Sequence, residues 1–159
     1  MAVDVGQKAP EFTLVDTELK QRSLAEFLAQ GRPVVLAFFP GAFTGVCTKE
    51  MCTFRDSFQR LRELQATLVA ISVDGPFANK AFAAEHNLPF PLLSDYNREV
   101  VRLYGVYHED FAGLKGYTAA KRSIFVLNGS GTVRYKWVTE NPGIEPPYDE
   151  VFRAVEQLK

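Results

Sequence analysis

The chain contains two cysteines, Cys47 and Cys52, and both lie within residues 40–52, a stretch that could form a redox site. Before it, residues 33–39 are a continuous apolar run rich in β-branched and aromatic side chains, which is typical of a buried strand. After it, large apolar residues recur at helical spacing, at Phe54, Phe58, Leu61 and Leu64. The pattern predicts that a strand ends where this stretch begins and that a helix begins near Thr44.

In this arrangement Cys47 falls in the first helical turn, where free backbone N–H groups and the helix dipole favour an anion such as a thiolate. A free cysteine with a pKa of about 8.5 is only a few per cent thiolate at pH 7. Lowering that pKa by about two to three pH units takes roughly 3–4 kcal/mol, whereas a helix terminus typically contributes about 0.3–1 kcal/mol. A nearby cation must supply the rest. We expect it to be Arg122, which opens a predicted strand; Lys121 and Arg134 are the competing cations.

Residues just before Cys47 could serve the same chemistry. Thr44 precedes it by three residues, so its hydroxyl can donate to the sulfur or to a bound oxygen, and it can also cap the helix. Pro40 has no N–H and can shield the sulfur from water, although it could simply end the strand. Phe43 is expected at the mouth of the pocket. Donors around a thiolate suit attack on a peroxide O–O bond, because the departing oxygen gathers negative charge.

The product of that attack is a sulfenic acid on Cys47, which a second thiol can convert to a disulfide. Cys52 is the only internal candidate for that thiol. Five helical residues separate two Cα atoms by about 8.6 Å, whereas a disulfide needs Cα atoms within about 7 Å. If Cys52 resolves Cys47, the segment between them must therefore unwind. A buried structural thiol at Cys52 is the alternative.

Composition argues against several other classes of protein. The length of 159 residues predicts one domain spanning 1–159. A net charge of −1 gives little support to a nucleic-acid or anionic-membrane partner, and no apolar run approaches the roughly 20 residues that span a bilayer. The N-terminus lacks the layout of a signal peptide, so we expect a cytoplasmic protein. His86 and His108 have no metal-like spacing, and we expect no metal or other cofactor.

The hydrophobic pattern predicts an α/β fold. We expect strands at 9–16, 33–39, 67–73, 122–127 and 132–138, a short connector at 91–95, and helices at 24–30, 44–65, 77–87, 97–104 and 151–158, with irregular segments at 106–121 and 139–148. Because a helix joins 33–39 to 67–73, these strands should be parallel, and an antiparallel hairpin should close the sheet. This is the layout of the thioredoxin-like fold, a central mixed sheet flanked by helices. Sites in such sheets lie beyond a strand's carboxyl end, where residues 40–47 fall.

These residues resemble the active-site signature of the peroxiredoxins, Pro-x-x-x-Thr-x-x-Cys, which Pro40, Thr44 and Cys47 match. Glu50 is similar to the glutamate that the family often carries three positions after its peroxidatic cysteine. Arg122 resembles the family's distant active-site arginine, and the resemblance implies that Glu50 orients it. The resemblance extends over essentially the whole chain.

Within the family, residues 47–56 are similar to the bacterioferritin comigratory, or peroxiredoxin Q, branch, whose resolving cysteine sits five residues on, at Cys52 here. Residues 39–47 also resemble the alkyl hydroperoxidase E branch, some of whose members rely on an outside thiol. The resemblance implies a thiol peroxidase that reduces hydrogen peroxide and organic hydroperoxides and is recycled by thioredoxin or a similar dithiol. It implies a monomer or a homodimer, and the C-terminal region lacks the cysteine that an intersubunit disulfide would use.

Two other functions stay open at this point. A thiol–disulfide oxidoreductase on the same fold usually carries Cys-x-x-Cys, which puts both sulfurs at one helix end, whereas four residues separate the cysteines here. A non-enzymatic redox sensor, binding module or holdase would use its disulfide state to alter partner affinity. Rapid oxidation of Cys47 by peroxide separates a peroxidase from the first alternative, and steady turnover with thioredoxin separates it from the second.

Overall fold

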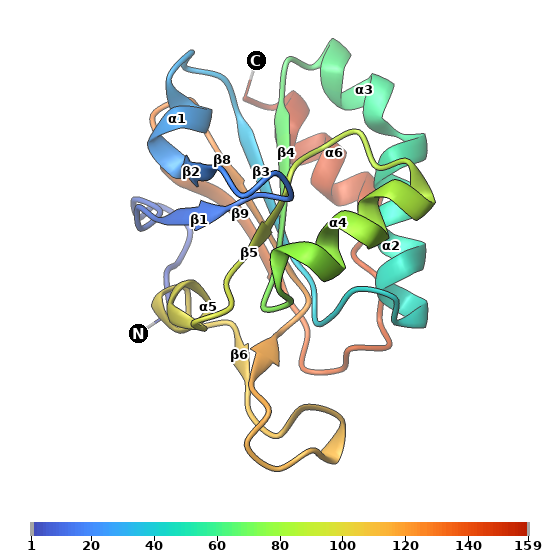
Figure 1. Cartoon of the computed structure of the whole chain (residues 1–159). Coiled ribbons are helices and arrows are strands. Elements are labelled where there is room, and N and C mark those ends of the chain that lie inside the picture. The colour runs from blue at the N-terminus through green and yellow to red at the C-terminus, as the bar shows by residue number, and fades with distance from the viewer. Residues whose placement is uncertain (1, 159) are drawn as a thin grey trace.

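The computed structural model describes residues 2–158; Met1 and Lys159, the ends of the predicted domain, lie outside the described residues. Seven strands form one mixed sheet in the order β2-β1-β5-β4-β3-β8-β9, and β6 pairs with β7 apart from it (Figure 1). The strands are β1 (Thr13–Val15), β2 (Gln21–Ser23), β3 (Val34–Phe38), β4 (Thr67–Ser72), β5 (Leu92–Ser94), β6 (Tyr107–His108), β7 (Ala119–Ala120), β8 (Ser123–Leu127) and β9 (Val133–Val138). The helices are α1 (Leu24–Leu28), α2 (Gly45–Asp56), α3 (Phe58–Glu63), α4 (Pro76–His86), α5 (Glu99–Leu103) and α6 (Tyr148–Glu156), with a 3₁₀ turn at Phe111–Gly113. Within residues 2–158, none of these helices combines the length and the apolar character needed to cross a membrane.

The centre of the sheet consists of fully buried strands. β3 and β4 run parallel, β8 runs antiparallel to β3, and β9 runs antiparallel to β8. Every residue of β3 and of β8 is buried, as expected for strands covered on both faces. The predicted parallel pair and the predicted antiparallel hairpin are both confirmed.

Helices cover both faces of this sheet, as Figure 1 shows. Helices α2, α3, α4 and α6 pack on one face, whereas α1 and α5 lie on the other. Successive side chains of β3 point to opposite faces. Val34, Leu36 and Phe38 join the core beneath α1 and α5, and Val35 and Ala37 join the core beneath α2 and α6. The predicted central mixed sheet flanked by helices is therefore confirmed.

The single helix predicted over 44–65 is wrong, because the structure has two helices that meet at Ser57. Ser57 has φ −100° and ψ 6°, outside the α-helical range. Phe54 before this break and Leu61 after it are both fully buried, so each helix turns an apolar face to the core. Apolar spacing continues through the break and carries no information about a change of helix axis.

Three short strands were not predicted. β2 extends the sheet by pairing with β1, and β6 pairs with β7 inside the segment 106–121 that was expected to be irregular. β1 itself is shorter than the predicted strand at 9–16. Strands of two or three residues present too few positions for an alternating pattern to identify them.

Gly129, in the turn between β8 and β9, lies against the backbone of Gly31. A Cβ atom added at Gly129 would overlap the Gly31 carbonyl group, so the backbone would have to move. We expect Gly129→Ala to lower the free energy of unfolding by about 1–3 kcal/mol, measured by urea denaturation. Gly45→Ala is the control, because no atom lies within 4 Å of its added Cβ and alanine favours a helix. Wild-type stability in Gly129→Ala would show that the turn relaxes at no cost.

Candidate active site

Cys47 lies in the first turn of α2, directly beyond the carboxyl end of β3. β3 ends at Phe38, residues 39–44 form a loop, and Thr44 is the N-cap of α2 with extended backbone angles. These boundaries agree closely with the predicted strand and helix. The side chain of Cys47 is 0% exposed. The thiol therefore sits at a helix N-terminus and is at the same time withdrawn from water.

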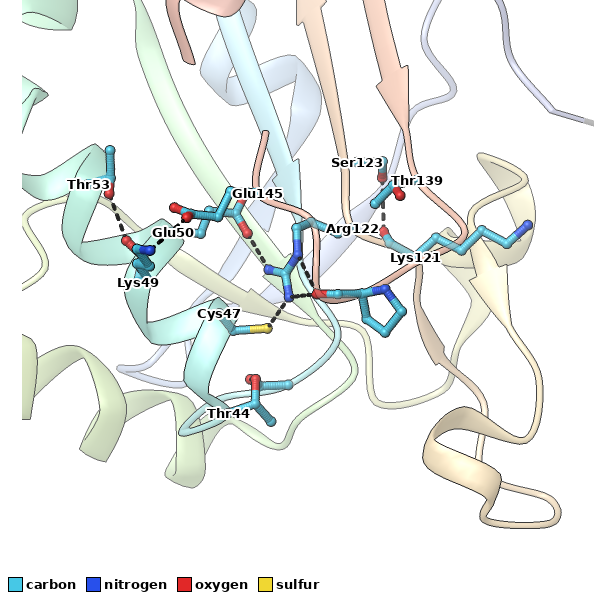
Figure 2. Close-up of polar contacts among 12 residues, drawn as sticks. Thr44, Cys47, Lys49, Glu50, Thr53, Lys121, Arg122, Ser123, Thr139 and Glu145 are labelled. Atoms are coloured by element: carbon cyan, nitrogen blue, oxygen red, sulfur yellow. Dashed lines mark hydrogen bonds and ion pairs between the residues drawn. The ribbon is translucent and has the colours of Figure 1, made fainter. Parts of the chain in front are cut away.

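Arg122 reaches Cys47 because of the register between β3 and β8. Phe38, the last residue of β3, pairs with Ser123, the first residue of β8, so the residue before β8 lies beside the loop that leads to the cysteine. Nη2 of Arg122 donates a hydrogen bond to Sγ of Cys47 at 3.1 Å. Arg122 is 2% exposed, and Figure 2 shows its guanidinium directed at the sulfur. The structure thus brings together the predicted thiol and the predicted cation.

The two competing cations lie elsewhere. Nζ of Lys121 forms a salt bridge with Oε2 of Glu140 at 2.8 Å. Arg134 is an exposed residue of β9. Among the described residues, Arg122 is the cation that is hydrogen-bonded to the Cys47 sulfur.

Two further acceptors fix the Arg122 guanidinium. Oε1 of Glu50 accepts from Nη1 at 2.6 Å, and the two side chains of this ion pair are 1% and 0% exposed. The carbonyl oxygen of Pro142 accepts from Nε at 3.2 Å and from Nη2 at 2.8 Å. A planar guanidinium can hold several acceptors at once, which an ammonium group does less well. The part played by Pro142 was not predicted, because a backbone carbonyl leaves no side-chain signal in a sequence.

Thr44 lies between two acceptors. Its hydroxyl donates to the carbonyl oxygen of Gly41 at 2.8 Å, and it is close enough to the Cys47 sulfur to lower the pKa of that thiol. One hydroxyl proton serves one acceptor at a time, so donation to a bound oxygen requires release of Gly41.

Phe43 is 51% exposed and packs edge-on against Phe82 on α4, with ring centroids 5.2 Å apart. Its place at the pocket mouth stays a prediction.

A polar network ties the active-site loop to the neighbouring strand. Pro40 is buried at the start of this loop. The N–H of Ala42 donates to Oδ2 of Asp74 at 2.7 Å, and the hydroxyl of Ser72 donates to the same oxygen at 2.8 Å. Asp74 lies two residues after the end of β4, so it couples the loop to the end of that strand. The prediction missed Asp74, although a polar residue at the carboxyl end of a buried parallel strand is a usable signal for a site.

Burial and charge act in opposite directions on the Cys47 thiol. Burial has the largest influence and raises the pKa of Cys47 above its ordinary value, whereas the Arg122 guanidinium, the Thr44 hydroxyl and the Gly41 backbone lower it. The expectation that a helix terminus and one cation suffice to lower this pKa is therefore wrong for this fully buried thiol. It did not count the hydration that a fully buried sulfur loses. The ionisation of Cys47 then depends on how fully Arg122 is available to it.

Glu50 experiences the same conflict. Burial raises the pKa of Glu50 to about 7, although Arg122 lowers it. Its second oxygen, Oε2, has no hydrogen-bond partner among the described residues. Burial lowers the pKa of Arg122, but the charges of Glu50 and Cys47 raise it overall, so the guanidinium stays positive. The single positive charge of Arg122 therefore stabilises the ionised forms of both Glu50 and Cys47.

Cys52 is not brought to Cys47. Both are free thiols of α2, and Cys52 is half-buried. Regular helical geometry places their Cα atoms about 8.6 Å apart, beyond the roughly 7 Å that a disulfide allows. Within residues 2–158, no group of three or more His, Cys, Asp or Glu side chains is arranged to hold a metal ion.

Comparison with known proteins shows the family to which this chain belongs. The AhpC/TSA family matches residues 5–136. Peroxiredoxin Q, chloroplastic, of Populus jackii is 41% identical over 158 residues, which cover 98% of this chain and 70% of that protein. The putative peroxiredoxin bcp of Coxiella burnetii is 37% identical over 137 residues, covering 86% and 89%. Peroxiredoxin Q, chloroplastic, of Gentiana triflora is 41% identical over 132 residues, or 83% of this chain, and the chain spans 58% of that relative's length.

Solved structures agree with this placement. The crystal structure of peroxidoxin BcpB from Mycobacterium tuberculosis has a TM-score of 0.86 and 31% identity, covering 98% of this chain and 97% of that one. A peroxiredoxin-like protein from Aquifex aeolicus has a TM-score of 0.87 at 27% identity, covering 100% and 90%. The predicted thioredoxin-like fold is thus confirmed, with a cysteine and a buried arginine at the expected edge of its sheet. The chain belongs to the AhpC/TSA family, the peroxiredoxins. Its similarity to peroxiredoxin Q and bcp proteins confirms the suggested branch.

The raised pKa of Glu50 makes stability depend on pH. The folded protein binds the Glu50 proton more tightly than the unfolded chain does, so Glu50 contributes stability below about pH 4.5 that is lost as the pH rises to about 7. Relative to Glu50→Gln, the wild-type free energy of unfolding should fall over this range by on the order of 3 kcal/mol. Urea denaturation of both proteins at several pH values measures the difference. Parallel pH profiles would contradict a raised pKa at Glu50.

Proposed function

We propose that this peroxiredoxin is a thiol peroxidase that reduces hydrogen peroxide and organic hydroperoxides through Cys47. The observation that carries the proposal is the buried Arg122 guanidinium, 3.1 Å from the Cys47 sulfur at the start of α2. A fixed cation and helix N–H groups in a water-poor pocket stabilise negative charge on a sulfur and on an oxygen leaving beside it. Family membership supports the same activity.

The proposed step is a displacement at oxygen. The Cys47 thiolate attacks one peroxide oxygen, and an S–O bond forms as the O–O bond breaks. The electron pair of the broken bond leaves with the second oxygen, which takes up a proton and departs as water or an alcohol. Arg122 stabilises the charge on that oxygen, and the Thr44 hydroxyl donates to it once released from Gly41. Buried Pro40 keeps water from the sulfur, and Cys47 is left as a sulfenic acid.

Cys52 is the proposed resolving thiol. The Cys52 thiol loses its proton and attacks the sulfur of the Cys47 sulfenic acid. A disulfide forms as the S–O bond breaks, and the hydroxyl group takes up a proton and leaves as water. Because both cysteines belong to one regular helix, α2 must open between them for the sulfurs to meet. The similarity to peroxiredoxin Q and bcp proteins supports this pairing.

The disulfide is then reduced by thioredoxin or a similar dithiol donor, which returns both thiols.

The oligomeric state, a monomer or a homodimer, stays a prediction. The cytoplasmic location also stays a prediction; the relatives from Populus jackii and Gentiana triflora are named as chloroplastic proteins.

A second candidate is a one-cysteine peroxidase whose sulfenic acid reacts with an external thiol. It is favoured by the separation of the two cysteines on intact α2 and by the half-buried position of Cys52. In that case, α2 stays helical throughout the cycle and Cys52 is a structural thiol.

Mass spectrometry after one equivalent of peroxide assigns both sulfurs. Wild type should become lighter by the mass of a hydrogen molecule, as a disulfide forms, and should lose helical circular dichroism. Cys52→Ser should gain one oxygen as a trapped sulfenic acid, and Cys47→Ser should not react. If Cys52→Ser turns over with thioredoxin as fast as wild type, the one-cysteine alternative is correct. If Cys47 does not react rapidly in any variant, the peroxidase proposal fails.

Arg122 should matter through its geometry as well as its charge. Arg122→Lys keeps the charge but cannot hold Glu50, Pro142 and Cys47 together, so we expect peroxide to oxidise Cys47 about 10²-fold more slowly. Arg122→Met should lose more. Stopped-flow oxidation measures these rates, and Arg134→Met, which alters an exposed arginine of β9, is the control. Equal rates for Arg122→Lys and wild type would reduce the role of Arg122 to that of a simple charge.

A further inference from the structure

A single buried guanidinium lies between two buried acids. Nη1 of Arg122 is 2.6 Å from Oε1 of Glu50, and Nη2 is 3.1 Å from Sγ of Cys47. Glu50 and Cys47 are 0% exposed and Arg122 is 2% exposed, so water screens none of the three groups well. Figure 2 shows the two acids projecting from the same helix toward the one cation.

Charge balance at this site allows one anion. If Glu50 and Cys47 are both ionised, the group of three residues carries a net negative charge in a medium that solvates it poorly. If one acid is ionised and the other protonated, the group is neutral. Two acids that share one cation therefore oppose each other's ionisation, and their titrations are coupled.

We propose that Glu50 and Cys47 share one proton across Arg122, so that Glu50 holds the proton when Cys47 is a thiolate. The exchange is Cys47–SH plus Glu50–COO⁻ giving Cys47–S⁻ plus Glu50–COOH; the net charge does not change and the proton passes by way of solvent. Glu50 acts on the sulfur through Arg122, so it is a positioning residue rather than a catalytic one. The inference rests on the proposed role of Cys47 as the reacting thiolate.

The surroundings of Glu50 favour its protonated form. Oε2 is buried and has no partner within the described residues, so an ionised carboxylate would be incompletely stabilised. The segment 139–147 brings Glu145 near, and that negative charge opposes a second one on Glu50. Glu145 is itself paired with Lys49 at 3.1 Å and accepts the Tyr148 hydroxyl of α6 at 2.8 Å. Arg122 is therefore the cation that Glu50 contacts.

Two groups that stabilise a thiolate face Cys47. Arg122 faces it from the start of β8, and Thr44 faces it from the loop before α2. As long as Glu50 is ionised, the positive charge of Arg122 is partly neutralised by the carboxylate and stabilises a Cys47 thiolate less. When Glu50 is protonated, the guanidinium charge stabilises the Cys47 thiolate alone. This sharing resolves the conflict between full burial of Cys47 and its proposed reaction as a thiolate.

The coupling predicts a characteristic titration curve for the thiolate. In the presence of Glu50, Cys47 should ionise in two steps, a partial one in the range where Glu50 titrates and a completing one at higher pH. In Glu50→Gln, the amide oxygen can still accept from Arg122 but carries no charge. Cys47 should then ionise in one step, with the upper wild-type step lowered by about one to two pH units.

The experiment follows the ultraviolet absorbance of the thiolate against pH in a Cys52→Ser background, where Cys47 is the remaining thiol. Glu50→Gln is compared with Glu145→Gln, which also removes one negative charge near Arg122 but from a residue that does not contact the guanidinium. Two steps in the parent and in Glu145→Gln, with one step at lower pH in Glu50→Gln, would support the shared proton. One step in the parent, or a higher pKa in Glu50→Gln, would overturn it and leave Glu50 as an orienting residue.

A reciprocal measurement covers the case in which Glu50→Gln folds poorly. Carbon NMR of the Glu50 carboxyl group in Cys47→Ser, where no thiolate can form, should show one titration step at lower pH than the final step in the Cys52→Ser parent. The same carboxyl curve in both proteins would refute the coupling. Stopped-flow oxidation of the parent by peroxide tests the peroxidase function separately. If Cys47 reacts rapidly but its titration is independent of Glu50, the shared proton is refuted and the peroxidase function is not.

Discussion

The hydrogen bonds of the buried Arg122 guanidinium join three parts of the chain that are distant in sequence. Arg122 precedes β8, Cys47 and Glu50 belong to α2, and the Pro142 carbonyl comes from the segment before α6. A guanidinium withdrawn from water needs acceptors on every side, because an unpaired buried charge costs several kcal/mol. The contacts that satisfy this need also place the sulfur, so the geometry of the site follows from the requirements of one buried ion.

The same burial sets up the main conflict of the site. Burial strengthens the attraction between Arg122 and an anion, but it also removes the water that stabilises a thiolate. On balance burial raises the pKa of both Cys47 and Glu50. In the proposed mechanism, the reactivity of Cys47 depends on which of the two acids is charged, as well as on how near Arg122 lies.

The sequence was sufficient to predict the parts that depend on pattern. A continuous apolar strand followed by helical spacing located Cys47 at the start of a helix, and Arg122 at the start of a strand was a good candidate because antiparallel registers bring such residues to the same edge. The resemblance to the family's distant active-site arginine favoured Arg122 over Lys121 and Arg134. Parallel pairing of β3 with β4 followed from the helix that joins them.

The parts that the sequence did not reveal depend on three-dimensional context. The Pro142 carbonyl has no side-chain signal, and the bond from Ala42 to Asp74 joins residues whose proximity only the folded sheet creates. Strands of two or three residues are too short to show a period. The pKa of Cys47 was judged from attractive charges alone, because the degree of burial is not available from a local motif.

The break at Ser57 separates the reactive helix from its neighbour. α2 ends at Asp56, α3 begins at Phe58, and β4 follows α3 at Thr67. Residues whose helical geometry is interrupted need not melt together, and regions of a protein can open as separate cooperative units. With a boundary at this point, the opening proposed for α2 would be confined to its own twelve residues. In the proposed redox cycle, the central sheet would then keep its register while α2 opens and re-forms.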